Sequence, residues 1–254
     1  MKFDHKIALI TGGNRGLGKN AALRLAGYGA DSIITYRSHN DEADSVVSEI
    51  EAKDQRAVAL QLDVGDIKSL DEFMNRVSGA LKDKWGRDKF DFLINNAGIG
   101  AHGTVDETSE TVFDNLFNIH FKGVYFLTQK AIPLINDNGR IINISSGLAR
   151  FSLPGYSAYA SMKGAIETYT RYLAKELGAK GITANVVAPG AIETDFNKAR
   201  FDAMPQIKEM IASQTALGRV GLPDDIGGVV AFLCSEDARW VNGQRLEASG
   251  GMFL

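Results

Sequence analysis

The sequence predicts an α/β fold in which one parallel sheet is covered by helices on both faces. Short apolar or β-branched runs recur along the chain, and segments with helical spacing separate most of them. This alternation is typical of a doubly wound domain. The runs that we expect to form strands are Ile7–Thr11, Ser32–Tyr36, Ala57–Leu62, Phe92–Asn95, Arg140–Ile144, Thr183–Ala188 and Arg245–Ala248.

The segments between these runs place apolar residues three or four positions apart, as one face of a helix does. Examples are Leu17, Ala21, Leu25 and Tyr28 in one segment, and Ile67, Leu70, Met74, Val77 and Leu81 in another. Pro223, followed by two aspartates, is typical of a helix start. No repeat, low-complexity stretch or Gly/Ser-rich linker interrupts the pattern, so we expect residues 1–254 to form one domain.

Composition excludes several classes of function. The 254 residues carry a net charge of −3, so there is no basic footprint for nucleic acid. No apolar stretch is long enough to span a membrane or to form the core of a signal peptide, and we expect a cytoplasmic protein. One cysteine allows no disulfide within the chain, and four scattered histidines predict no metal site.

A glycine-rich run, Thr-Gly-Gly-Asn-Arg-Gly-Leu-Gly at residues 11–18, follows the first predicted strand and precedes a helix. At such a junction the backbone can approach a pyrophosphate, and the N–H groups of the helix point at it. A tight turn alone could also use glycines, but the position favours a dinucleotide site. The residues expected to contact the cofactor here are Gly12, Asn14, Arg15, Gly16, Leu17 and Gly18.

The second predicted strand ends in Tyr36-Arg37-Ser38, with no acidic residue before Asp41. Sites for NAD usually place a carboxylate here to bind the ribose 2′-hydroxyl. Arg37 and Ser38 can instead bind a 2′-phosphate, and Arg15 can add a second cation. The sequence therefore predicts a preference for NADP(H) over NAD(H).

Two further strand ends carry polar or small residues at the same edge of the sheet. Asp63 and Val64 follow the third predicted strand, and Asn95-Asn96-Ala97-Gly98 follows the fourth. We expect Asp63, Val64, Asn95, Ala97 and Gly98 to lie along the cofactor, although Asp63 and Asn95 could also be turn residues.

Tyr159 and Lys163 are four residues apart in a helical stretch, so their side chains share one face. A nearby ammonium is expected to lower the pKa of the phenol and to make it a better acid or base. Ser146 ends the fifth predicted strand, where its hydroxyl could bind a carbonyl oxygen. We therefore predict hydride transfer between a nicotinamide and a carbonyl or alcohol carbon, with Tyr159 as general acid/base.

Taken together and in this order, these motifs resemble the short-chain dehydrogenase/reductase family over nearly the whole chain. They are the glycine-rich run, Asn-Asn-Ala-Gly, Ser146, Tyr159-x-x-x-Lys163, Pro189-Gly190 and the closing Ser249-Gly250-Gly251. The pattern is most similar to 3-oxoacyl-(acyl-carrier-protein) reductases, glucose dehydrogenases and related ketone reductases.

The resemblance implies a seven-stranded parallel sheet in a Rossmann fold and, usually, a homotetramer. It also implies that Pro189, Gly190, Ile192 and Thr194 hold the nicotinamide end of the cofactor. Helices around residues 109–136 and 155–179 would form one subunit interface, and the last strand and tail the other.

The chain departs from the family pattern at His120, where an Asn usually supports a proton relay to the catalytic lysine. His120 could replace that Asn as a relay, since imidazole both donates and accepts. It could instead be a structural histidine, or could mark a chain with weakened catalysis. We carry no role over to Asn118, which lies on a different face of the helix.

By resemblance, the substrate lies between the loop after Ser146 and a lid at about residues 192–214. Apolar side chains from these segments and the tail predict an apolar or aromatic small-molecule substrate. They are Leu148, Phe151, Leu153, Phe196, Phe201, Met204, Met252 and Phe253, although several could simply pack the lid. Arg150 could meet an anionic group or be solvated.

The sequence thus favours an NADPH-dependent carbonyl reductase. The alternatives are a 3-oxoacyl thioester reductase and, from a different class, a dinucleotide-binding sensor that has lost turnover.

Overall fold

The computed structural model describes residues 1–195, 197, 201, 202 and 204–254. Its core is a seven-stranded sheet in the order β3-β2-β1-β4-β5-β6-β7, in which every pair of neighbours is parallel. The strands are β1 (Ile7–Ile10), β2 (Asp31–Tyr36), β3 (Ala57–Gln61), β4 (Phe90–Asn95), β5 (Ile135–Ile144), β6 (Thr183–Pro189) and β7 (Arg245–Ala248). The predicted doubly wound α/β class and the seven strands are confirmed.

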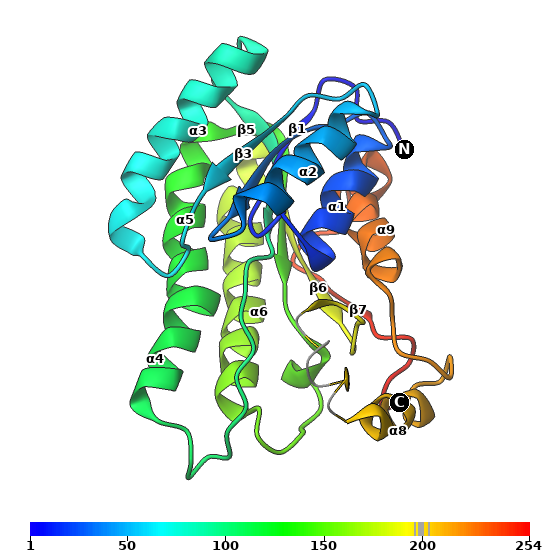
Figure 1. Cartoon of the computed structure of the whole chain (residues 1–254). Coiled ribbons are helices and arrows are strands. Elements are labelled where there is room, and N and C mark those ends of the chain that lie inside the picture. The colour runs from blue at the N-terminus through cyan, green and yellow to red at the C-terminus, as the bar shows by residue number, and fades with distance from the viewer. Residues whose placement is uncertain (196, 198–200, 203) are drawn as a thin grey trace.

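Helices cover both faces of the sheet (Figure 1). One face packs against α1 (Gly16–Ala26), α2 (Asn40–Glu51) and α9 (Pro223–Cys234), and the other against α3 (Leu70–Trp85), α5 (Gly123–Ala131) and α6 (Ser157–Leu177). Strand β1 shows the division, because Ala8 and Ile10 enter one core and Ile7 and Leu9 enter the other. All four side chains are fully buried, which is why these strands read as continuous apolar runs.

The continuous helix expected over residues 109–136 is divided and ends earlier. Helix α4 (Glu110–Phe117) runs through a π-helical turn, Asn118–Lys122, into α5, and Ile132–Leu134 forms a 3₁₀ turn. Pro133 lacks an N–H for the next helical bond, so the α-helix does not continue past it. Strand β5 begins directly afterwards at Ile135, paired with Phe90, five residues before the predicted start at Arg140.

The carboxyl ends of the strands meet along one edge of the sheet, and this edge is open to a ligand. The chain extends from β1 toward β2 and β3 on one side, and then from β4 toward β7 on the other. Such a switch point leaves a crevice between the diverging loops. Helix α8 (Pro205–Ser213) lies beyond this edge (Figure 1). Within the described part of the chain, no helix has the length and apolar character to span a membrane.

Gly123 at the start of α5 lies against the backbone that follows β3. A Cβ built on Gly123 would be 2.0 Å from the Val64 carbonyl oxygen and 2.8 Å from that of Asn118. Gly79 in α3 is also helical, but a Cβ there meets nothing within 4 Å. A side chain therefore has room at Gly79 but not at Gly123, although both residues have a helical backbone conformation.

We predict opposite effects of alanine at these two positions. Gly79→Ala should raise the free energy of unfolding by about 0.5–1 kcal/mol, because alanine loses less backbone entropy than glycine on folding. Gly123→Ala should lower it by about 1–3 kcal/mol, because α5 must shift off a rigid carbonyl. Urea unfolding of both variants checks this. A Gly123→Ala protein as stable as Gly79→Ala would contradict the close approach.

Candidate active site

A cavity at the carboxyl edge of the sheet collects most of the residues predicted to bind cofactor or substrate. Loops after each of the first six strands contribute to its wall. The predicted cofactor residues that line it are Gly12, Asn14, Arg15, Gly16, Leu17, Arg37, Ser38, Asp63, Val64, Ala97, Gly98, Tyr159, Lys163, Pro189, Gly190, Ile192 and Thr194. Gly18, Tyr36 and Asn95 are not among the lining residues.

The glycine-rich loop between β1 and α1 requires glycine on steric grounds. Gly12 and Gly16 have φ values of +61° and +54°, a region that favours glycine. A Cβ on Gly18 would lie 2.1 Å from the Gly12 carbonyl oxygen, so only glycine at residue 18 lets the helix approach the loop this closely. Helix α1 has no side-chain cap and no acidic residue in its first turn. Its positive N-terminal end therefore faces the cavity without an internal anion, as a phosphate site needs.

The wall after β2 is cationic and polar. Arg37, Ser38 and His39 are exposed and line the cavity, and Arg15 reaches it from the glycine loop. The side chain of Asn14 is already bound, since its Nδ2 donates to Glu42 Oε2 at 2.7 Å. The arginines at this end of the cavity provide the charge that a phosphate would need.

Of two adjacent asparagines, the structure places Asn96 at the cavity and not Asn95, which was the one predicted to contact the cofactor. Asn95 is buried, and its Nδ2 donates to Thr128 Oγ1 at 3.0 Å and to Asn143 Oδ1 at 2.8 Å. Asn96 lines the cavity instead and donates to the carbonyl oxygens of Thr11 and Gly12. Because side chains alternate along a strand, only one of two neighbours can face the crevice.

Ser146, Tyr159 and Lys163 converge on the cavity from two elements. Ser146 follows β5, and the other two lie one turn apart on α6. Lys163 is buried, its Nζ donates to the Ile144 carbonyl oxygen at 2.8 Å, and the same nitrogen lies 5.6 Å from the centre of the Tyr159 ring. The three side chains therefore form one cluster, as the sequence predicted.

Burial dominates the protonation of this cluster. It raises the pKa of the Tyr159 hydroxyl to about 12, although a hydrogen bond with Ser146 acts in the opposite direction. It also lowers the pKa of Lys163 to about 8. The expected lowering of the phenol pKa is therefore wrong for the chain alone, because loss of hydration outweighs the hydrogen bond with Ser146. Tyr159 holds its proton at neutral pH.

His120 lies in the π-helical turn, is 1% exposed and borders the cavity. Its Nε2 is 2.7 Å from the Ile99 carbonyl oxygen, and its ring meets the Tyr159 ring edge-on with centroids 5.1 Å apart. Burial, with a contribution from the Lys163 charge, lowers the pKa of the imidazole to about 3. The ring is neutral at physiological pH and does not titrate near neutrality.

The far wall of the cavity combines the predicted lid with the loop after β5. Leu148, Phe151, Leu153, Phe201 and Met252 line it as predicted, and Tyr156 and Ile211 join them. Met204 is exposed and is not among the lining residues, while Phe253 packs on Phe151 with centroids 4.7 Å apart. Phe196 lies outside the described residues. Sequence reasoning missed Tyr156, whose position three residues before Tyr159 was its only signal.

Arg150 has a partner that neither sequence interpretation included. Its Nε and Nη2 donate to the two carboxylate oxygens of Glu247 at 2.6 and 2.7 Å. The guanidinium is exposed, and it is bound within the chain rather than presented to an anionic substrate.

Comparisons with known proteins find similar sequences and structures over nearly the whole chain. A family model described as enoyl-(acyl carrier protein) reductase matches residues 12–253. Versicolorin reductase stcU of Emericella nidulans is 36% identical over 262 residues, with 99% of this chain and 97% of the relative covered.

Two solved structures are similar over nearly their whole length. The promiscuous reductase LugOII, which catalyses keto-reduction at C1 during lugdunomycin biosynthesis, has a TM-score of 0.95 and 36% identity, with 100% of both chains covered. The angucycline C-6 ketoreductase LanV, solved with bound NADP, also has a TM-score of 0.95 and 36% identity, covering 99% of this chain and 97% of that one. With its parallel seven-stranded sheet and the cluster of Ser146, Tyr159 and Lys163, this chain belongs to the short-chain dehydrogenase/reductase family.

Proposed function

We propose that this chain uses NADPH to reduce a ketone carbonyl on an aromatic, polycyclic substrate. The observation that carries the proposal is the meeting of Ser146, Tyr159 and Lys163 in one cavity with the glycine-rich loop. The family and the ketoreductases among the similar structures support carbonyl chemistry at such a site.

Ser146, Tyr159 and Lys163 each have a role that follows from their contacts and protonation. The hydroxyls of Ser146 and Tyr159 bind the carbonyl oxygen, and the protonated phenol donates its proton as negative charge develops there. NADPH supplies the hydride that goes to the carbonyl carbon. Lys163, anchored on the Ile144 carbonyl, contributes positive charge beside the phenol below its pKa of about 8.

The residues in the loops at the carboxyl edge of the sheet fit this cofactor. The glycine positions allow a pyrophosphate to approach the backbone, and the uncapped start of α1 favours its charge. Arg15, Arg37 and Ser38 are available to the 2′-phosphate that distinguishes NADPH from NADH. LanV with bound NADP and a blue fluorescent protein solved with NADPH, 38% identical, support the same preference.

The substrate class follows from the wall of the cavity and from the relatives. Phe151, Tyr156 and Phe201 offer aromatic surface, and Leu148 and Met252 are apolar. A wall of this composition suits an aromatic ligand. Among the relatives, stcU is named a versicolorin reductase, and LanV is also solved with bound rabelomycin. The 3-oxoacyl thioester alternative is less well supported, since Arg150 is paired with Glu247 and is not free for an anionic carrier.

We also infer that the protein assembles through α4, α5 and α6. Tyr125 and Tyr169 stack on this side with centroids 4.6 Å apart, and Phe113 is 43% exposed. Such an exposed aromatic face favours contact with a second copy, in line with the homotetramer that the family resemblance implies.

For His120 we propose a structural role. Its bond to the Ile99 backbone, its burial and its neutral state support the structural interpretation over a titrating relay. The intact cluster beside it gives no support to the sensor interpretation.

The function is tested by following NADPH oxidation with fused-ring aromatic ketones, monocyclic ketones and an acyl-thioester ketone. We expect turnover that is fastest with the fused-ring ketones. Tyr159→Phe should lower kcat by about 10²–10⁴-fold with little change in NADPH affinity, because it removes the proton donor and keeps the ring. Tyr172→Phe, on an exposed part of the same helix, is the control. Tight NADPH binding without wild-type turnover would refute the reductase and favour the sensor.

Cofactor preference is tested by Arg37→Ala and Arg15→Ala. Each should reduce the preference for NADPH over NADH about ten- to hundredfold, because a hydrogen bond to a charged group contributes about 1.5–3 kcal/mol. The measurement is kcat/KM with each cofactor. Arg24→Ala, in the last turn of α1, should leave the ratio unchanged. An unaltered ratio in both test variants would place the 2′-phosphate elsewhere.

The structural role of His120 predicts a pH-dependent stability. Below pH 6.5 the unfolded chain gains a proton on this histidine that the folded chain does not, so folding loses stability as the pH falls. Between pH 6.5 and about 4 this loss should be about 1.4 kcal/mol per pH unit, and His120→Asn should lack it. Unfolding free energies of wild type, His120→Asn and the exposed control His5→Asn measure the slope. Equal slopes in all three would contradict a buried neutral imidazole.

A further inference from the structure

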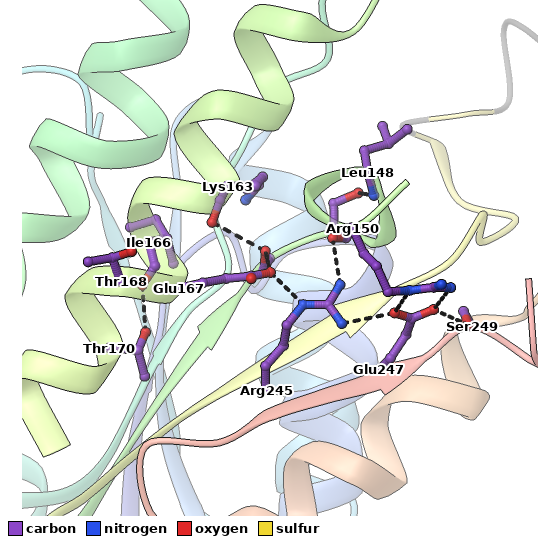
Figure 2. A network of polar contacts seen from close by, with 12 residues as sticks. Leu148, Arg150, Lys163, Ile166, Glu167, Thr168, Thr170, Arg245, Glu247 and Ser249 are labelled. Atoms are coloured by element: carbon purple, nitrogen blue, oxygen red, sulfur yellow. Dashed lines mark hydrogen bonds and ion pairs between the residues drawn. The ribbon is translucent and has the colours of Figure 1, made fainter. Parts of the chain in front are cut away.

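Arg245, the first residue of β7, connects three parts of the chain beside the catalytic cluster (Figure 2). Its Nε donates to Glu167 Oε1 on α6 at 2.7 Å, and its Nη1 donates to Glu247 Oε2 at 2.8 Å. Its Nη2 donates to the backbone carbonyl oxygen of Ser146 at 3.2 Å. One guanidinium therefore binds two carboxylates and the backbone of the serine that faces the substrate cavity.

On its inner side, the network reaches the helix that carries Tyr159 and Lys163. Glu167 lies one turn after Lys163 on α6 and is 15% exposed. Ser145 Oγ donates to Glu167 Oε1 at 2.8 Å, next to the Arg245 contact on the same oxygen. The two residues that follow β5 are thus both connected to Glu167, Ser145 directly and Ser146 through Arg245.

On its outer side, the network reaches the tail. Arg150 pairs with both oxygens of Glu247, and its Nη2 also donates to the Met252 carbonyl oxygen at 2.8 Å. Met252 lines the substrate cavity. The series Glu167, Arg245, Glu247, Arg150 alternates in charge, so each side chain inside it has an opposite charge on both sides.

The arrangement needs the shape of an arginine at residue 245. Burial acts against ionisation of Glu247, but hydrogen bonds from Arg150 and Arg245 lower the pKa of its carboxyl to about 2. The carboxylate is therefore charged at all physiological pH values. A planar guanidinium can donate hydrogen bonds to three acceptors in fixed directions, whereas a lysine ammonium is a single point charge.

We propose that Arg245 is a positioning residue that holds Ser146 in line with Tyr159. Through Glu247 and Arg150, it also connects Ser146 to Met252, the tail residue that lines the substrate cavity. The inference rests on the proposed function, since it concerns the alignment of Ser146 for ketone reduction. Small displacements of an aligned group can cost about 10²-fold in rate, so loss of this contact should appear in kcat. Arg150, at the outer end, should act mainly on KM for the ketone.

The test compares Arg245→Met and Arg245→Lys with Arg56→Met and Arg56→Lys. Arg56 is a matched control, because it also binds a carboxylate, Asp31, and a backbone carbonyl, that of Lys84, but at the other end of the strands. Kinetics are normalised to NADPH-binding sites, so that misfolded protein does not count. Melting temperatures of all variants are measured alongside.

We expect kcat to fall at least tenfold in Arg245→Met and less in Arg245→Lys, with NADPH affinity changed less than twofold. Arg56→Met should lose stability but keep kcat per site, and Arg150→Met should raise KM more than it lowers kcat. Should Arg245→Met not fold, Arg245→Lys carries the test.

Wild-type kcat per site in the folded Arg245 variants, from an active wild-type enzyme, would overturn the positioning role and leave a purely structural network. A wild type without ketone turnover would instead overturn the proposed function, and this inference with it.

Discussion

The hydrogen bond from Lys163 to the carbonyl of Ile144 is the contact on which the candidate site depends. It joins α6, which carries Tyr159, to the last residue of β5, directly before Ser145 and Ser146. The ammonium is buried, and losing this acceptor would leave a charge without a partner in a site of low polarity. The contact therefore fixes the position of the helix along the strand as well as the lysine itself.

Neighbouring contacts extend the same alignment in both directions. Deeper in the sheet, Asn143 donates to Thr170 Oγ1 at 2.9 Å, again from β5 to α6. Toward the surface, Ser145 binds Glu167, and Arg245 binds Ser146 from the other side. Satisfied buried polar pairs of this kind are specific about geometry, because a shift by one residue would break all of them together.

Much of the fold and the centre of the site could be predicted from local patterns. Strands buried on both faces appear as apolar runs, and Tyr159 and Lys163 share a helical face whatever surrounds them. The glycine-rich run predicted a dinucleotide site because it lies between a strand and a helix. Where a residue's role depended on which way one of two neighbours faces, as with Asn95 and Asn96, sequence offered no means of choosing.

Ion pairs between residues far apart in the chain could not be predicted from the sequence. Glu167, Arg245 and Arg150 look like ordinary surface charges in the sequence, and 78 positions separate the first two. Only the folded chain brings β7 beside α6. The direction of the Tyr159 pKa shift was missed for a related reason, since it depends mainly on how much water the fold removes from the hydroxyl.

Two parts of the far wall of the cavity are held in different ways, and this bears on selectivity. The wall of Phe151 and Met252 is fixed by the guanidinium of Arg150, which binds a carboxylate and the tail backbone at once. Another part includes Phe201, packed with Ile207 and Val220 in a small apolar cluster. Apolar packing tolerates changes of shape better than directional ion pairing does. The ion-paired part should therefore contribute most to selection among the substrates of the proposed reductase, and the apolar cluster to tolerance of their substituents.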